Sequence, residues 1–264
     1  MLSTKAGSRS SKLGYLNLAR SRQTIVVVTT QIVQNSMSEN QPADRQDDVT
    51  YPRSPMLIDC SQFPARDLYK VLIGSVVPRP IAWVSTANNE GVLNLAPFSF
   101  FNAFAASPPI LGIGIGSRTV TARDGTLERT PKDTFINIRD TEEFVVNVVS
   151  KELVEKMVLT SGEYEPDVSE FKEVDIACAE STLIKPPRVA DAKIAMECVL
   201  HQIVNLSGSA NLVLGKIVCI HVSDAVYKDG EIDLIALAAV GRLSGDAYCD
   251  TSSLFEIERP VVNS

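Results

Sequence analysis

Short apolar runs separated by turn residues dominate the chain from Leu57 onwards. Most are about four to eight residues long, are rich in Val, Ile, Phe and Thr, and are bounded by Gly, Pro, Asn and Asp, which is typical of strands in a multi-stranded β-structure. Residues 87–91 (Ala-Asn-Asn-Glu-Gly) have the composition of a hairpin turn between the first two runs. The runs that we predict to be strands cover residues 81–86, 92–95, 98–105, 110–115, 144–149, 193–206, 212–226 and 241–248.

Helical spacing of apolar residues is confined to short segments. Residues 64–71 and 151–159 place apolar side chains on one face, and residues 130–139 begin with a strong helix-start signal. In that signal Thr130 is the N-cap and Pro131 the first helical residue, followed by an acidic residue as in a capping box. The pattern therefore predicts a mainly β fold with peripheral helices. A barrel is the preferred architecture, because open apolar sheet edges would aggregate.

The N-terminal segment has a different composition. Residues 1–36 contain five basic residues and no acidic one, with a single apolar run at residues 25–28, which is typical of a mitochondrial transit peptide. That run is far shorter than the roughly 20 apolar residues that span a bilayer. Alternatively, Met37 is the true start and residues 1–36 are upstream sequence. Residues 38–56 are polar and interrupted by proline, which predicts a linker.

Composition and charge narrow the class of protein. The 264 residues are 45% apolar and 22% charged, which fits a soluble globular protein and excludes a fibrous or wholly disordered chain. The net charge of −7 gives no support to nucleic-acid binding. The five cysteines are widely spaced without a Cys-x-x-Cys pair, which argues against a zinc site or a disulfide framework and predicts a reducing compartment. We expect a cytoplasmic protein, or a mitochondrial one if the transit peptide is real.

Several features resemble functional motifs but give little support for a chemical role. Residues 112–116 (Gly-Ile-Gly-Ile-Gly) lack the spacing of a dinucleotide fingerprint and alternate as a strand does. His201 and His221 have no acid or cysteine at ligand spacing, so neither a metal site nor a hydrolase triad is predicted. His221 keeps an alternative role as a proton donor near a cofactor. Residues 162–175 are interpreted as a solvated acidic stretch.

Two segments could bind a ligand. The predicted helix start at residues 130–134 would present free amides to an anion, with Lys132 adding charge and Thr134 a hydroxyl. Ser117 and Arg118 follow directly on a strand and could bind phosphate oxygens. An ordinary cap with solvated charges is the alternative. Residues 94–102 interleave polar and aromatic side chains around a proline, which suits contact with a flat ligand, although a plain strand is also possible.

Together, the ordered motifs resemble the flavin reductase-like, FMN-binding split-barrel family, which includes the flavoredoxins. The resemblance covers about residues 57–260 and implies one split-barrel domain there, after a leader and linker at residues 1–56 and before a tail at residues 261–264. The motifs are Arg-Pro-Ile-Ala-Trp-Val-Ser-Thr at 79–86, Asn-Leu-Ala-Pro-Phe-Ser-Phe-Phe-Asn at 94–102, Ser-Pro-Pro at 107–109, Lys-Asp-Thr at 132–134 and Glu-Phe-Val-Val-Asn at 143–147, continued by Pro-Pro-Arg-Val at 186–189, Glu-Cys at 197–198 and Leu-Gly at 214–215.

The resemblance implies FMN as cofactor and assigns residues to it. One side of the flavin site would be lined by Arg79, Pro80, Ile81, Ala82, Ser85 and Thr86. The isoalloxazine ring would be held, largely through the backbone, by Asn94, Ala96, Pro97, Phe98, Ser99, Phe100 and Phe101. The phosphate would be held by Ser117, Arg118, Lys132 and Thr134. The polar insert at residues 120–129 departs from the tighter loop expected of the family, so Arg118 is the less secure phosphate ligand.

The resemblance also implies an activity. NADH or NADPH would pass hydride to FMN, and the reduced flavin would pass electrons to an acceptor that the sequence does not identify. This chemistry belongs to the cofactor, so no catalytic side chain and no metal ligand is predicted. Family members are homodimers, which predicts a second copy of the chain as partner and no role for nucleic acid or membrane. The alternative is a non-catalytic FMN-binding electron carrier that a partner protein reduces.

Overall fold

The structure is a computed structural model that describes residues 56–122 and 124–261. A compact unit begins at Leu57. The predictions of a transit peptide, of a start at Met37 and of a linker lie outside the described residues, apart from Met56. The tail predicted at residues 261–264 is described only at Val261.

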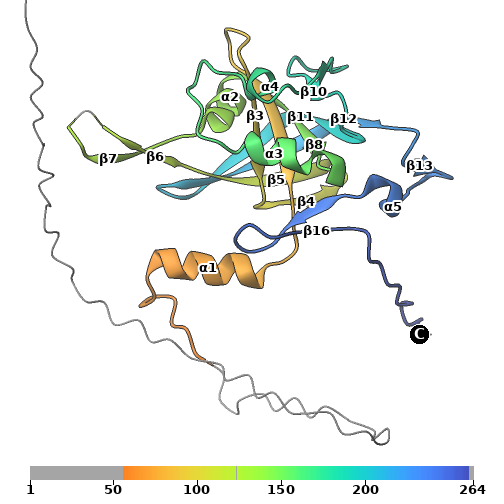
Figure 1. Ribbon diagram of the computed structural model, residues 1–264, viewed down its shortest axis with the longest axis horizontal. Helices are drawn as coiled ribbons and strands as arrows, with labels where there is room; N and C mark the ends of the chain where they lie inside the picture. Colours follow the sequence, from red (N-terminus) through yellow and green to blue (C-terminus); the bar gives the residue numbers. More distant parts are fainter. Residues whose placement is uncertain (1–55, 123, 262–264) are drawn as a thin grey trace, which may run out of the picture. The chain divides into compact units, whose positions relative to one another are not determined.

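The main element is a seven-stranded antiparallel sheet with the strand order β3-β2-β8-β11-β12-β5-β4. β4 follows β3 after only two residues, although these strands stand at opposite ends of that order, so the sheet curls round into a barrel (Figure 1). A hydrogen bond from the Gly114 amide to the Phe100 carbonyl, 2.6 Å long, lies at this corner. The strands are β2 (Ala82–Ala87), β3 (Leu93–Phe98), β4 (Phe101–Ala106), β5 (Pro109–Gly116), β8 (Glu143–Val148), β11 (Ile194–Ser207) and β12 (Ala210–Val222).

Apolar side chains that alternate along these strands fill the barrel. Val84, Ile113, Phe144 and Val213 are fully buried in one cluster. Gly215 of β12 leaves room for Phe144, because a Cβ at this position would come within 2.3 Å of the aromatic ring. The barrel is therefore a packed core, and a ligand must bind on its outer side.

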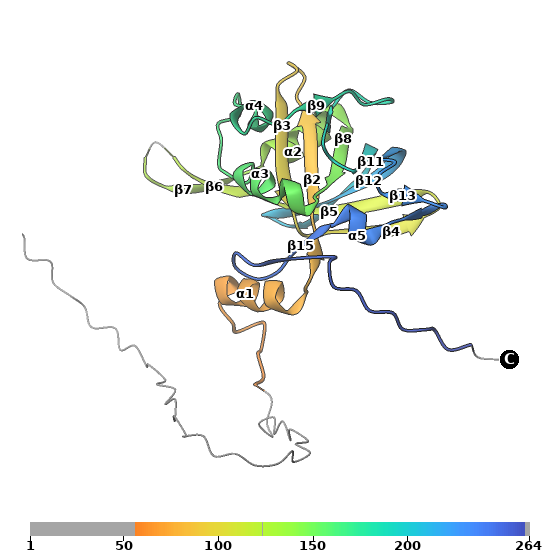
Figure 2. The ribbon, with the colours of Figure 1, turned by 45° about the vertical axis from the view of Figure 1, so that its right-hand side comes forward.

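A second apolar cluster covers the outer face of β2 and β3. Trp83 and Leu95 pack there against Met157, Phe171 and Val189. Helices α3 and α4 lie over this face in both views (Figures 1 and 2). The covering elements are η1 (Lys151–Leu153), α3 (Val154–Leu159), α4 (Glu170–Glu173), β9 (Cys178–Ala179) and β10 (Arg188–Val189).

The remaining elements are short. None of the described helices is long and apolar enough to cross a membrane. The remaining elements are α1 (Ala65–Ser75), β1 (Arg79–Pro80), β6 (Arg118–Thr121), β7 (Leu127–Thr130), α2 (Asp133–Thr141), β13 (Tyr227–Lys228), β14 (Glu231–Ile232), α5 (Leu234–Leu237), β15 (Val240–Arg242) and β16 (Tyr248–Asp250).

The strand prediction is confirmed for the glycine-rich β5, for the β2–β3 hairpin and for the long strands β11 and β12. Helices are confirmed at residues 65–75 and 151–159, the latter as η1 followed by α3. The run predicted as one strand at 241–248 instead forms the two strands β15 and β16, which pair with each other. The turn between these two strands occupies the middle of the run.

The predicted start of α2 is wrong. The helix begins at Asp133 with Lys132 as its N-cap, and no side chain caps it. Thr130 is instead the last residue of β7, where it pairs with Arg118 across the β6–β7 hairpin that the polar insert forms. The Thr130 hydroxyl accepts a hydrogen bond from Arg118 Nε, 3.3 Å away, and so is not available as a cap.

Candidate functional site

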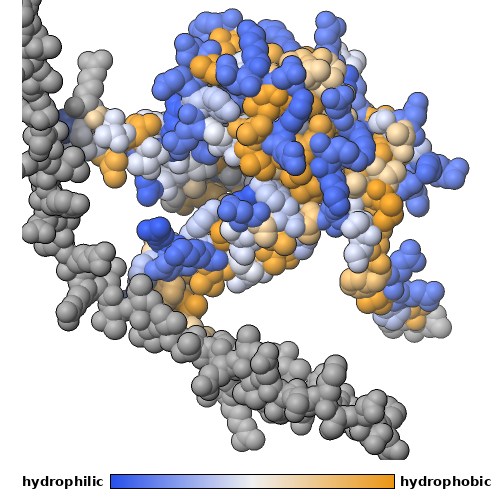
Figure 3. Space-filling view, viewed as in Figure 1, coloured by the Kyte–Doolittle hydropathy of each residue, from blue (hydrophilic) through white to orange (hydrophobic). Residues whose placement is uncertain are grey.

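Two neighbouring cavities lie along the outer side of β3 and share Pro97 and Ser161. In the view of Figure 3 the surface is hollowed between the region of α3 and that of α1. The first cavity, of about 400 Å³, is lined by Tyr69, Ile73, Arg79, Ile81, Pro97, Ser99, Met157, Ser161, Arg242, Gly245, Asp246 and Tyr248. The second, of about 120 Å³, is lined by Asn94, Ala96, Pro97, Arg118, Lys132, Asp133, Thr160, Ser161, Gly162, Glu163, Tyr164 and Glu170.

The smaller cavity contains two basic side chains, of which only one is paired with an acidic residue of the described chain. Arg118 forms two hydrogen bonds with Asp133, of 3.0 and 3.3 Å, so its guanidinium is largely neutralised. Lys132 is exposed, and within the described residues no carboxylate forms an ion pair with it. Its Nζ lies 5.7 Å from the centre of the Phe98 ring, over the face of the ring. Lys132 is therefore the cation most available to an anionic ligand.

The start of α2 adds backbone donors beside Lys132. The Phe135 amide donates to the Lys132 carbonyl, 2.9 Å away, which leaves the amides of Asp133 and Thr134 at the positive end of the helix dipole. Thr134 does not add a free hydroxyl, because it is buried and accepts a 2.8 Å hydrogen bond from Asn94 Nδ2. That bond instead fixes α2 against β3. The cavity can thus hold an anion through one ammonium group and backbone N–H groups.

Glu170 lies in the wall of the smaller cavity, which the sequence did not suggest. It belongs to the stretch predicted to be solvated, yet its side chain is only 6% exposed and accepts a 2.9 Å hydrogen bond from the Leu95 amide. The prediction fails here because the neighbouring Phe171 packs on the apolar cluster and draws Glu170 inward. Burial raises the pKa of Glu170, and nearby Asp133 adds to this, whereas backbone hydrogen bonds oppose it.

Arg79 organises the larger cavity. Its side chain is 5% exposed and donates hydrogen bonds to the carbonyls of Ile73, Val76 and Leu243, at 2.5, 2.8 and 2.9 Å. A longer contact of 3.4 Å joins it to the Ser99 hydroxyl. Arg79 therefore ties the end of α1 to the β15–β16 hairpin and leaves its positive charge at the cavity wall.

The β15–β16 hairpin closes the other side of this cavity. The Arg242 guanidinium lies 4.4 Å from the centre of the Tyr248 ring and donates to the Tyr248 hydroxyl. It also donates to the Gly245 carbonyl, 2.5 Å away. No local sequence pattern indicated Arg242 or Tyr248, because an apolar run does not show which side of a hairpin faces a cavity.

The structure brings together eight of the predicted cofactor residues at the two cavities. Those that do not line either cavity are held elsewhere: Ser85 donates a 2.6 Å hydrogen bond to the Pro187 carbonyl, Thr86 accepts one of 3.0 Å from Asn137, and Phe98 packs inside the barrel. The residues that line a cavity are Arg79, Ile81, Asn94, Ala96, Pro97, Ser99, Arg118 and Lys132. The others are Pro80, Ala82, Ser85, Thr86, Phe98, Phe100, Phe101, Ser117 and Thr134. For both groups, a role in cofactor binding stays a prediction.

The sequence matches the family model of the flavin reductase like domain over residues 73–236, more than half of the chain. The chain belongs to the flavin reductase-like family. Its split-barrel fold is the fold of that family, as the resemblance predicted.

Relatives of the chain support the family assignment. A protein of Aquifex aeolicus is 41% identical over 182 residues, which cover 69% of this chain and 88% of the relative. The crystal structure of nitrilotriacetate monooxygenase component B from Bacillus cereus is 33% identical with a TM-score of 0.71, over 78% of this chain and all of that one. The structure of Pseudomonas fluorescens 2-nitrobenzoate 2-nitroreductase NbaA is 33% identical with a TM-score of 0.69, over 78% of this chain and 96% of that one.

Proposed function

We propose that this flavin reductase-like protein binds FMN along the outer side of β3 and reduces it with NADH or NADPH. The observation that carries the proposal is the adjacency, at Pro97, of a cavity of about 400 Å³ and a smaller cavity that contains the start of α2 and Lys132, which has no ion pair among the described residues. FMN has the same two parts, a flat ring system and a phosphate. The larger cavity lies within the roughly 300–1,000 Å³ that ligand pockets occupy.

The residues present fit FMN at both ends. Lys132 and the first-turn amides of α2 would hold the phosphate, since charge-assisted hydrogen bonds to phosphate oxygens are the strong ones. β3 is last in the strand order, with β2 as its neighbour. On its other edge the Leu95 amide already donates to Glu170 and Pro97 has no N–H, so this edge would offer carbonyl groups to the ring. Tyr69 and Tyr248 supply aromatic surface at the larger cavity, suited to a flat ring.

FMN, when bound, supplies the hydride acceptor, so the protein needs to contribute no nucleophile. The side chains would position the ring and exclude water from one of its faces. Arg79 and Arg242 would stabilise the negative charge that the ring gains with hydride, because both place a guanidinium at the cavity wall. Met157 and Ile81 would keep that wall apolar and so strengthen these interactions.

We further propose that the electrons leave to a separate acceptor. The name of the Bacillus cereus relative, component B of a monooxygenase, favours a partner monooxygenase as acceptor class. The name of the Pseudomonas relative makes a nitroaromatic compound the second class to try. We also propose that residues 57–260 function as one domain within a homodimer.

The test is anaerobic reduction. The purified full chain is incubated with FMN, freed of excess, and mixed with NADH or NADPH while the flavin absorption band is followed. We expect a yellow protein that bleaches with one of the two nicotinamides. A yellow protein that stays oxidised with both would leave an electron carrier and disprove hydride transfer. Failure to retain FMN would disprove the cofactor assignment, and retention of FAD in its place would correct it.

A further inference from the structure

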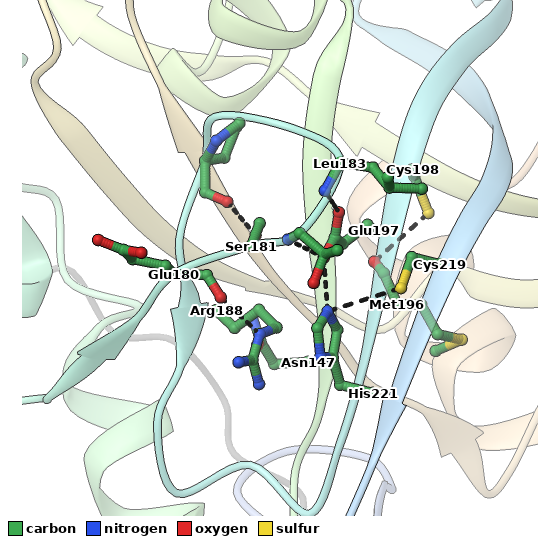
Figure 4. A network of polar contacts seen from close by, with 12 residues as sticks. Asn147, Glu180, Ser181, Leu183, Arg188, Met196, Glu197, Cys198, Cys219 and His221 are labelled. Atoms are coloured by element: carbon green, nitrogen blue, oxygen red, sulfur yellow. Dashed lines mark hydrogen bonds and ion pairs between the residues drawn. The ribbon is translucent and has the colours of Figure 1, made fainter.

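Glu197, Cys219 and His221 form a cluster of donor atoms that is separate from both cavities (Figure 4). Glu197 pairs with Cys219 across β11 and β12, and His221 is two residues further along, so all three project from one face of the sheet. One donor atom from each lies within 4.8 Å of the others. The expectation that His221 has no acid or cysteine at ligand spacing is therefore wrong: Cys219 lies two residues away on the same strand, and the antiparallel pairing brings Glu197 beside both.

Two of the contacts in the cluster converge on one atom. His221 Nε2 is 2.5 Å from Glu197 Oε1 and 3.7 Å from Cys219 Sγ. A nucleophile–histidine–acid relay needs the two ring nitrogens to face different partners, so this cluster does not have the geometry of a cysteine hydrolase. Three unlike donors gathered around one point are instead the arrangement of a metal site.

Glu197 is held in place as a metal-binding carboxylate requires. It is fully buried, and its two oxygens accept hydrogen bonds from the amides of Thr182 and Leu183, 2.6 and 2.7 Å away. Such partners orient a metal ligand and commonly determine its affinity. Glu197 is therefore already oriented before any metal arrives.

We propose that Glu197, Cys219 and His221 bind Zn²⁺, with a fourth position open to solvent. A thiolate and an imidazole select zinc and similar transition metals, whereas Mg²⁺ and Ca²⁺ prefer oxygen ligands alone. The ion can enter from solvent, since the His221 side chain is 24% exposed and Cys219 is only half-buried. On binding, the Cys219 S–H bond gives way to a sulfur–zinc bond, and its proton passes to solvent. The proton between His221 Nε2 and Glu197 must leave as well, to solvent or to His221 Nδ1.

The donor spacing needs only a local adjustment. Zinc bonds of about 2.0–2.3 Å place tetrahedral donors roughly 3.3–3.6 Å apart. The 3.7 Å between Cys219 and His221 already fits that spacing. His221 must withdraw from Glu197 by about 1 Å, a small rotation of a ring that is partly in solvent. Because residues 1–55 contain neither Cys nor His, the described residues hold every thiol and imidazole of the protein.

The experiment is a titration of the tag-free full chain with Zn²⁺ after treatment with a chelator, and calorimetry measures the binding. Co²⁺ serves as a second probe, because a thiolate ligand gives it a charge-transfer absorption. We expect one ion per chain, with Cys219→Ser and His221→Gln each weakening binding by about tenfold or more. His201→Gln and Cys178→Ser are matched controls, which remove the other histidine and an exposed thiol, and should bind as the parent does.

Glu197→Gln keeps the shape of the buried side chain and is expected to weaken Zn²⁺ binding without unfolding. If this variant does not fold, the test relies on the variants at the two partly exposed positions, Cys219 and His221. Circular dichroism checks that those variants fold. Absence of one-to-one binding would overturn the proposal. So would equal affinity in the parent and His221→Gln, or an equal loss in the control variants. FMN is not present in the titration, so the result is independent of the proposed function.

Discussion

At the residue scale, similar side chains acquire different roles from their neighbours. Arg118 and Lys132 both read as phosphate ligands in the sequence. In the structure Asp133 neutralises Arg118, whereas Lys132 has no acidic partner within the described part of the chain. The β6–β7 hairpin, which the polar insert forms, is what holds Arg118 in that ion pair. Lys132 is accordingly the residue on which phosphate binding should depend.

We expect Lys132→Ala to weaken FMN binding by about 1–3 kcal/mol, the range for loss of a charge-assisted hydrogen bond. Riboflavin, which has no phosphate, should lose much less affinity. Both are measured by fluorescence titration. Lys185→Ala is the matched control, because Lys185 is exposed and lines neither site cavity. Equal losses for FMN and riboflavin would show that another group holds the phosphate.

At the scale of elements, strands are specified by what they pack against. β12 reads as a plain apolar run, but Gly215 within it is required by the Phe144 ring of β8. Gly116 at the end of β5 has no such neighbour, since the nearest atom to a Cβ there is 3.8 Å away. Both glycines lie in strands and neither has the positive φ that would favour glycine for its backbone alone. The difference between them is therefore one of packing.

Gly215→Ala should destabilise the protein by about 1–3 kcal/mol, the usual range for overpacking a core. The Phe144 ring cannot move away without shifting the barrel interior that it fills. Gly116→Ala in β5 should change the free energy of unfolding by much less. Urea unfolding of the two variants and the parent measures both effects. A Gly215→Ala variant as stable as the parent would show that the interior is more adaptable than its packing indicates.

At the scale of the whole molecule, some apolar surface is not used within the described chain. Helix α1 has no buried residue, and Leu72 on it is 47% exposed. Phe104 of β4 is 61% exposed, while Tyr69 of α1 lies against Phe100 with ring centres 6.4 Å apart. The contact between Tyr69 and Phe100 brings apolar side chains of α1 and of the corner before β4 together at the surface, which is typical of a protein–protein contact. They support the homodimer proposed above.

We expect the parent protein to sediment as a dimer and Leu72→Glu to shift it towards the monomer, because a charge would be buried without a partner. Analytical ultracentrifugation over a range of concentrations measures this. Leu127→Glu, on the exposed β6–β7 hairpin, is the control and should leave the assembly unchanged. A parent that is monomeric at all concentrations would remove the homodimer from the proposal.

The sequence by itself determined the main strands of the barrel, the barrel class and the family, because alternation of apolar residues and the order of short motifs are local properties. It also selected Pro97 and Lys132 as candidate ligand residues, and both line the cavities. Only the tertiary structure decided which residues from other parts of the chain complete the walls of the two cavities. Arg242 and Glu170 reach the cavities through long-range packing that no local pattern records. The same reason hid the cluster around His221, since antiparallel pairing joins residues that lie more than twenty positions apart.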